Sequence, residues 1–224
     1  MLQTACTTVE LHELLSRESI ISPHQTIASP VGPIFLQHRC SPSLVESLSV
    51  DSGLRAFARL PEREHALLLG LARRPDSMIT LAYTPAGEIV GQVTLAPADA
   101  WWGGLGNSYE IAVEVSSGWR KLGIARQLLA LVFAQEHLEH HIILGMGLCW
   151  HWDTEGLGIN RFRYRELVAQ LFAPYGFVEY LTSEANIRMD PANILLVRLG
   201  RDVDQETLNQ FFYRLFQSDT LPGL

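Results

Sequence analysis

Apolar and polar positions alternate most regularly from residue 108 to residue 115, and a helical pattern follows a few residues later. The apolar positions are Ile111, Val113 and Val115, and the acidic ones are Glu110 and Glu114. A period of two is typical of a half-buried strand. From 126 to 134, apolar residues recur at helical spacing. The sequence therefore predicts a strand, a tight loop and a helix, and we expect the rest of the chain to be arranged around this unit.

Similar patterns predict the other elements. Strands are expected over residues 26–37 (with a turn inside), 78–84, 88–95, 141–149, 177–181 and 193–199, and helices over 43–48, 61–74, 160–172 and 203–216. A strand–helix–strand unit of this spacing should be parallel and right-handed. The strands on either side of the central helix are therefore expected to run parallel in a mostly antiparallel sheet, which predicts an α+β fold with a mixed sheet.

The length of the chain sets its domain organisation. With 224 residues, of which 47% are hydrophobic, the chain can bury the core of one domain with elaborated ends. We divide it into an N-terminal extension (1–25), a single domain (26–200) and a C-terminal helix packed on that domain (201–224).

Charge and cysteine content exclude several classes of protein. The net charge is −7, which argues against a nucleic-acid binder. No apolar stretch reaches transmembrane length, and the N-terminus has no signal-peptide pattern. The three cysteines Cys6, Cys40 and Cys149 form neither a disulfide framework nor a zinc pattern. We expect a cytoplasmic protein with reduced thiols and no membrane contact.

The loop between the central strand and helix has the composition of a phosphate site. It contains Gly123 and Ala125 at the helix start, with positive charge from Arg120, Lys121 and Arg126. Small residues let the backbone approach a ligand, while free N–H groups and the helix dipole favour a phosphate. We predict that main-chain amides from Lys121 to Arg126 bind a diphosphate, which includes Leu122 and Ile124 in the site.

The spacing Arg120-x-x-Gly123-x-Ala125 resembles the [R/Q]-x-x-G-x-[G/A] signature of GNAT-type acyltransferases. Neither G-x-G-x-x-G nor G-x-x-x-x-G-K-[ST] occurs in the chain. The resemblance implies the GNAT fold: a mostly antiparallel sheet, one parallel pair of strands splayed at the cofactor site, and helices on both faces. It also implies an N-acetyltransferase that uses acetyl-CoA, whose pantetheine arm and thioester carbonyl would meet the backbone near Val113 and Val115.

Four further segments resemble the acetoin-utilisation branch of the GNAT superfamily. They are Trp150-His151-Trp152-Asp153, Tyr164-Arg165, Asp190-Pro191-Ala192-Asn193 and Arg198-Leu199-Gly200-Arg201. The likeness spans roughly residues 26–216. It implies that the enzyme acetylates a lysine of AMP-forming acetyl-CoA synthetase and inactivates it. We predict that residues 150–153 bind the substrate. His151 either orients the substrate, relays a proton, or is an ordinary histidine in an aromatic patch.

Acetyl transfer to a lysine needs a base, because the ordinary pKa of a lysine side chain is about 10.4. Glu110 and Glu114 lie on one face of the predicted strand, roughly 13 Å apart. The resemblance favours Glu114 as the base and leaves Glu110 as a second carboxylate or water-relay partner. Many GNAT enzymes carry a tyrosine as the acid for the leaving thiolate, but Phe172 occupies that position, so no acid is assigned.

The histidine run His137, His140 and His141 invites a metal interpretation, but it lacks a paired acidic ligand pattern. We interpret it as a solvated helix end and predict no metal. Two other functions stay open at this point. One is a GNAT enzyme for a small amine, and the other is a non-catalytic module that binds acyl-CoA. The sequence does not predict an oligomeric state.

Overall fold

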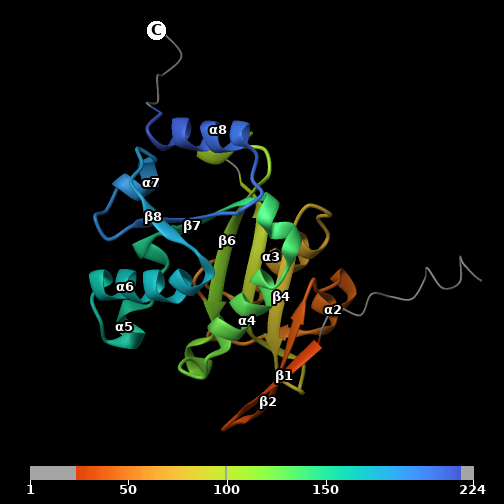
Figure 1. Cartoon of the computed structure of the whole chain (residues 1–224). Coiled ribbons are helices and arrows are strands. Elements are labelled where there is room, and N and C mark those ends of the chain that lie inside the picture. Colours follow the sequence, from red (N-terminus) through yellow and green to blue (C-terminus); the bar gives the residue numbers. More distant parts are fainter. Residues whose placement is uncertain (1–23, 99, 218–224) are drawn as a thin grey trace, which may run out of the picture.

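A mixed, open sheet forms the centre of the computed structural model, which describes residues 24–98 and 100–217 (Figure 1). Within these residues the sheet has nine strands in the order β1-β2-β4-β5-β6-β7-β9-β8, with β3 beside β5. The strands are β1 (His24–Ser29), β2 (Gly32–His38), β3 (Ser49–Val50), β4 (Met78–Tyr83), β5 (Glu88–Pro97), β6 (Ser108–Val115), β7 (Ile142–Gly147), β8 (Val178–Tyr180) and β9 (Ile194–Leu199). Most neighbouring strands are antiparallel, as predicted.

Helices cover both faces of this sheet. They are α2 (Pro42–Ser47), α3 (Pro61–Ala72), α4 (Ile124–Phe133), α5 (Thr154–Leu157), α6 (Arg161–Phe172), α7 (Ala185–Arg188) and α8 (Gln205–Leu215). Short 3-10 turns connect several elements: η1 (Ala100–Trp102), η2 (Ser117–Trp119), η3 (Glu136–His140), η4 (Cys149–His151) and η5 (Ala173–Tyr175). No helix of residues 24–98 and 100–217 is long and apolar enough to span a membrane.

The two faces have separate hydrophobic cores. One face packs against α4 and α6, with Leu128 and Leu129 buried against strand residues such as Val93. On the opposite face, α2 and α3 cover one end, where Leu68 of α3 joins the core. At the other end α8 inserts Phe211 beside Trp102. Each cluster is the apolar side of an amphipathic element buried on the sheet, and this burial is the main source of stability.

β6 and β7 are parallel neighbours that separate along their length. Their pairing joins Ser108 to Ile142, and it ends where Glu110 meets Leu144. Beyond this point β6 continues to Val115 beside β5, while β7 continues to Gly147 beside β9. The sheet is therefore split between the two strands, and the backbone of residues 111–115 lacks a sheet partner on the β7 side.

This architecture confirms the predicted fold class, including the splayed parallel pair. The central helix predicted from residue 126 begins at Ile124, and the segment predicted as one interrupted strand over 26–37 forms the β1–β2 hairpin. The predicted C-terminal helix is α8, packed through Phe211 and Leu215. Because β1 begins at His24 and residues 1–23 lie outside the described residues, the division into extension and domain stays a prediction.

Candidate active site

The start of α4 leaves a row of backbone N–H groups without acceptors. Gly123 is the N-cap residue, with a φ of 79° in the left-handed region that glycine tolerates, and no side chain caps the helix. Lys121 also has a positive φ, of 65°. Across the described residues, no protein oxygen accepts from the amides of Lys121 to Arg126. These free donors lie at the positive end of the helix dipole, an arrangement that favours phosphate groups.

Arg120, predicted to contact the cofactor, is held by protein partners. Its Nη1 donates to Asp153 at 2.5 Å, and its Nε donates to the Val115 carbonyl at 3.3 Å. The Asp153 carboxyl also caps α5 by accepting from the Gly156 N–H. The Arg120 hydrogen bond holds the pKa of Asp153 below its ordinary value. Arg120 thus ties the end of β6 to the segment 150–153, and its contact with a cofactor stays a prediction.

A cleft of about 1060 Å³ opens where β6 and β7 separate. Most of the predicted site residues line it: Glu110, Val113, Glu114, Val115, Arg120, Ala125, Trp150, His151, Trp152 and Asp153. The others do not: Lys121, Leu122, Gly123, Ile124 and Arg126. Of these, Ile124 turns its side chain into the core, whereas Lys121, Gly123 and Arg126 are exposed beside the cleft. The split sheet thus brings together the loop, the strand and the segment 150–153.

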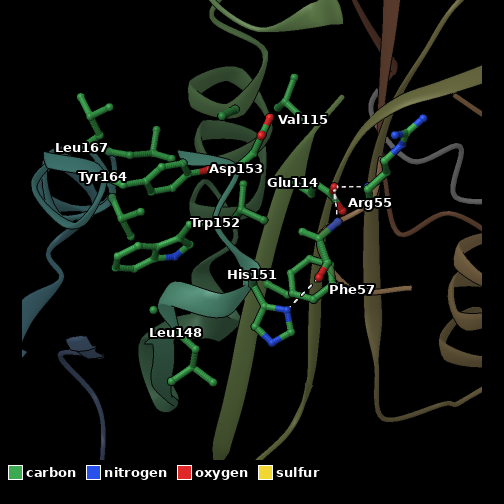
Figure 2. A pocket seen from close by; sticks show the side chains of 18 of the residues that line it. Arg55, Phe57, Glu114, Val115, Leu148, His151, Trp152, Asp153, Tyr164 and Leu167 are labelled. Atoms are coloured by element: carbon green, nitrogen blue, oxygen red, sulfur yellow. Dashed lines mark hydrogen bonds between the residues drawn. The ribbon is translucent and has the colours of Figure 1, made fainter. Parts of the chain in front are cut away.

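Glu114 is buried, and its carboxylate is bound by backbone groups of another segment. Its Oε1 accepts from the N–H of Arg55 at 2.6 Å and from the N–H of Ala56 at 2.8 Å, as Figure 2 shows. Its Oε2 lies 3.4 Å from Nε2 of Gln92 on β5. Burial raises the pKa of Glu114, the Glu64 charge adds to this rise, and the backbone and Gln92 hydrogen bonds oppose it. Glu114 is therefore not a solvated surface glutamate.

A second buried carboxylate completes the network around Glu114. Glu64 of α3 is 1% exposed, and its Oε1 accepts from Nε2 of Gln92 at 2.6 Å. Its Oε2 accepts from the N–H of Ala58 at 3.1 Å. Together the two glutamates bind three backbone amides of the segment 55–58. This segment, which lies between β3 and α3, therefore forms one wall of the cleft.

Glu110 lies on the same face of β6 as Glu114, in a different environment. It is opposite Ala96 of β5 and Leu144 of β7, at the point where the parallel pairing ends. Its side chain is half-buried and lines the cleft. The two glutamates are four residues apart, roughly 13 Å along the strand. They therefore lie at the two ends of the open part of β6.

His151 faces the cleft from the β7 side. Its Nδ1 lies 2.7 Å from the Ala56 carbonyl oxygen, so the same residue that donates to Glu114 also bonds this histidine. The ring is 5.6 Å from the ring of Phe57, beside it in Figure 2, and 6.0 Å from that of Trp150. Trp150 is 45% exposed and Phe57 is 39% exposed. An aromatic rim thus surrounds this side of the cleft.

The opposite wall comes from α6, and sequence reasoning missed most of it. Tyr164 stacks on Trp152 with ring centroids 5.1 Å apart, and Leu167 follows one turn later (Figure 2). Burial is the main cause that raises the pKa of Tyr164. From the sequence, the Tyr164-Arg165 pair is part of the resemblance and has no assigned role. Phe172, at the usual tyrosine position, is buried and lines the cleft.

The histidine run does not gather metal ligands. Nδ1 of His141 bonds the His137 carbonyl oxygen at 2.9 Å, and the His141 ring stacks on Tyr109. Within the part of the chain that the structure describes, no group of three or more His, Cys, Asp or Glu side chains could hold a metal ion. Cys40 and Cys149 are free thiols, whereas Cys6 lies outside the described residues.

Comparison with known proteins agrees with this geometry. The model of the acetyltransferase (GNAT) family matches residues 43–155, which contain β6, the free amides and most of the cleft. The chain belongs to the GNAT family and is an acetyl-CoA-dependent acetyltransferase.

Individual relatives narrow the resemblance to one branch. The chain is 30% identical over 190 residues to the acetoin utilization protein AcuA of Bacillus subtilis, covering 83% of this chain and 90% of that one. It is 29% identical over 185 residues to AcuA of Bacillus licheniformis, covering 80% and 87%. It also resembles the crystal structure of an acetoin utilization protein from Exiguobacterium sibiricum, with a TM-score of 0.82, 28% identity and coverage of 87% and 93%. The predicted resemblance to the acetoin-utilisation branch is confirmed.

Proposed function

We propose that this acetyltransferase moves the acetyl group of acetyl-CoA to a lysine side chain of a protein. The acceptor is AMP-forming acetyl-CoA synthetase, which acetylation inactivates, and the reaction takes place in the cytoplasm. The acceptor is the one that the acetoin-utilisation branch implies, and the similarity to AcuA over 83% of the chain supports it.

The observation that carries this proposal is that free amides lie beyond the end of β6, a strand whose β7 side has no sheet partner from residue 111 to residue 115. The N–H groups of Lys121 to Arg126 have no acceptor within the described residues, and they lie at the end of the open half of β6. A diphosphate would bind these amides, with the charges of Lys121 and Arg126 beside it. The open backbone of residues 111–115, including Val113 and Val115, would hold the pantetheine arm and polarise the thioester carbonyl.

The reaction joins the acceptor nitrogen to the thioester carbon and breaks the bond between carbon and sulfur. The acceptor ammonium loses two protons on becoming an amide: one goes to a base, and the other goes to the leaving thiolate of coenzyme A. Glu114 and Glu110 are the predicted proton acceptors. The raised pKa of Glu114 makes its carboxylate a stronger base than an exposed one. Its Oε1, however, already accepts two backbone N–H groups.

A second candidate function is acetylation of a small amine. The aromatic rim of Phe57 and Trp150, with the stacked Trp152 and Tyr164 deeper inside, supports it. Aromatic faces bind organic cations by cation–π attraction. A lysine side chain and a polyamine share this chemistry, so an assay with both acceptors decides between them.

Radiolabelled acetyl-CoA incubated with purified acetyl-CoA synthetase tests the proposal. We expect label in the synthetase and loss of its activity in parallel. Mass spectrometry then locates the modified lysine, and a synthetase with arginine at that position should take up no label and keep its activity. Label in polyamines or other small amines, with none in the synthetase, would contradict the protein acceptor and favour the second candidate.

A further inference from the structure

The hydrogen bond between His151 and Ala56 determines which ring nitrogen carries a proton. A carbonyl oxygen can only accept, so the 2.7 Å contact requires a proton on Nδ1 of His151. In the neutral ring the lone pair is then on Nε2. The contact thus selects the tautomer in which Nε2 can take up a proton.

Nε2 of His151 makes no hydrogen bond to the described residues, and His151 lines the cleft. Among the described residues, the buried side-chain nitrogens without a hydrogen-bond partner belong to His38, Trp102, His137 and Arg165. Nε2 of His151 is not one of them, and His151 is half-buried in the cleft wall. Figure 2 shows the ring with one nitrogen bonded toward the Phe57 segment and the other turned away from it. The second nitrogen is available to a group that enters the cleft.

A single residue connects this histidine to Glu114. The N–H of Ala56 donates to Oε1 of Glu114, and the carbonyl oxygen of Ala56 accepts from Nδ1 of His151. The glutamate therefore holds the residue that orients the histidine. This role explains why Glu114 is buried and why its Oε1 accepts two backbone N–H groups. A carboxylate bound in this way is poorly placed to exchange a proton with a substrate.

We propose that Nε2 of His151 accepts the first proton from the acceptor ammonium, and that Glu114 is a positioning residue acting through Ala56. This inference rests on the proposed acetyl transfer. The acceptor ammonium gives one proton to Nε2, and the resulting amine forms its bond to the acetyl carbon as the carbon–sulfur bond breaks. The second proton that the nitrogen loses goes to the coenzyme A thiolate. The imidazolium keeps its Nδ1–H on the Ala56 carbonyl and returns the extra proton to water.

The first part of the test replaces the histidine. His151→Ala and His151→Gln should lower kcat by about 100-fold or more, because general-base catalysis contributes on the order of 10²–10⁴-fold. Affinity for acetyl-CoA, measured by calorimetry, should stay unchanged. Added imidazole should restore part of the rate of His151→Ala, since it can occupy the space of the lost ring. His140→Gln is the matched control: His140 is exposed and does not line the cleft, so its rate should equal that of the native enzyme.

The second part separates positioning from proton transfer at Glu114. Glu114→Gln keeps an oxygen that can accept from the N–H groups of Arg55 and Ala56, so kcat should fall by no more than about fivefold. Glu114→Ala removes that oxygen, and kcat should fall by at least tenfold with unchanged acetyl-CoA affinity. Rescue by the conservative glutamine is expected of a positioning residue and not of a base.

Several outcomes would overturn the inference. A native rate in His151→Ala, or an imidazole effect equal in native and variant enzymes, would remove His151 from the reaction. A loss of 100-fold in Glu114→Gln or Glu110→Gln, with His151→Gln unaffected, would give the base role to a carboxylate. All rates are measured with acetyl-CoA synthetase and with a lysine peptide. If only the peptide is acetylated, the protein acceptor is wrong, while the His151 results still identify the base. If no amine is acetylated, both proposals are overturned.

Discussion

The helices α4 and α6 begin in opposite ways. At the start of α6, Asn160 takes an extended conformation and its side chain accepts from the Arg163 N–H at 2.9 Å. At the start of α4, Gly123 takes a left-handed conformation and no side chain caps the helix. Among the described helices, α2, α5, α7 and α8 are also capped by a side chain, and α3 begins with Pro61 and two acidic residues in its first turn.

The difference is what we expect if the start of α4 serves the proposed diphosphate site rather than stability. A side-chain cap is worth about 1 kcal/mol, and acidic residues in the first turn add to it. α4 has neither, although it buries five residues and is the central helix of its face. α6 buries only Phe172 and has a cap together with surface ion pairs such as Arg165 with Glu179. Thus α4, which buries more residues than α6, is the helix whose N-terminal amides are free.

Of the substitutions at the two helix starts, Ala125→Glu should change acetyl-CoA affinity most. It puts a carboxylate at the second position of α4, where the diphosphate is proposed to bind, and like charges at this distance repel strongly in a partly buried site. We expect acetyl-CoA affinity to fall on the order of 10- to 100-fold, while the free protein becomes as stable or more stable, since an acidic first turn favours the helix. Calorimetry and urea denaturation measure the two quantities.

The matched control is Phe162→Glu, at the second position of α6. Phe162 is 48% exposed and does not line the cleft. This variant should gain the same helix-dipole stabilisation with unchanged affinity. Equal affinity in Ala125→Glu and the native protein would mean that the diphosphate binds elsewhere.

Gly123→Ala should have a smaller effect on binding. An added Cβ meets no atom within 4 Å, but the φ of 79° is costly for any residue with a side chain. We expect a loss of about 1–2 kcal/mol in the free energy of unfolding and a several-fold loss in acetyl-CoA affinity. Gly176→Ala, with a φ of 81° and only an ordinary contact to Arg198, should lose the same stability and keep its affinity. Similar acetyl-CoA affinities for both variants would show that the start of α4 tolerates a side chain at position 123.

The unit from β6 to α4 could be predicted from the sequence because it is local. Alternating residues, a glycine and an apolar helix follow one another within 27 residues, from Ser108 to Ala134. The parallel pairing with β7 followed from the handedness of such units. The free amides and the carboxylates on β6 could also be predicted from the sequence, because each lies inside this one segment.

The contacts of Glu114 could not be predicted, because they come from far along the chain. Ala56 is 58 residues away, in a segment with no periodic pattern. Likewise, counting back from Gly176 reaches Phe172, so the spacing assigns no acid, whereas Tyr164, a tyrosine that lines the cleft, lies roughly two helical turns earlier. Local spacing identifies a strand or a loop, but the wall that faces it depends on the tertiary arrangement.

Asn160→Ala should have the smallest effect on binding. It removes the cap of α6 and leaves the Arg163 N–H without its side-chain acceptor, so the free energy of unfolding should fall by about 1 kcal/mol. Acetyl-CoA affinity and kcat should not change, because the start of α6 lies outside the cleft, in contrast to Tyr164 and Leu167 further along the helix. If acetyl-CoA affinity fell together with stability, the start of α6 would also affect the cofactor site. The packing of α6 would then have to explain why the amides of α4 are free.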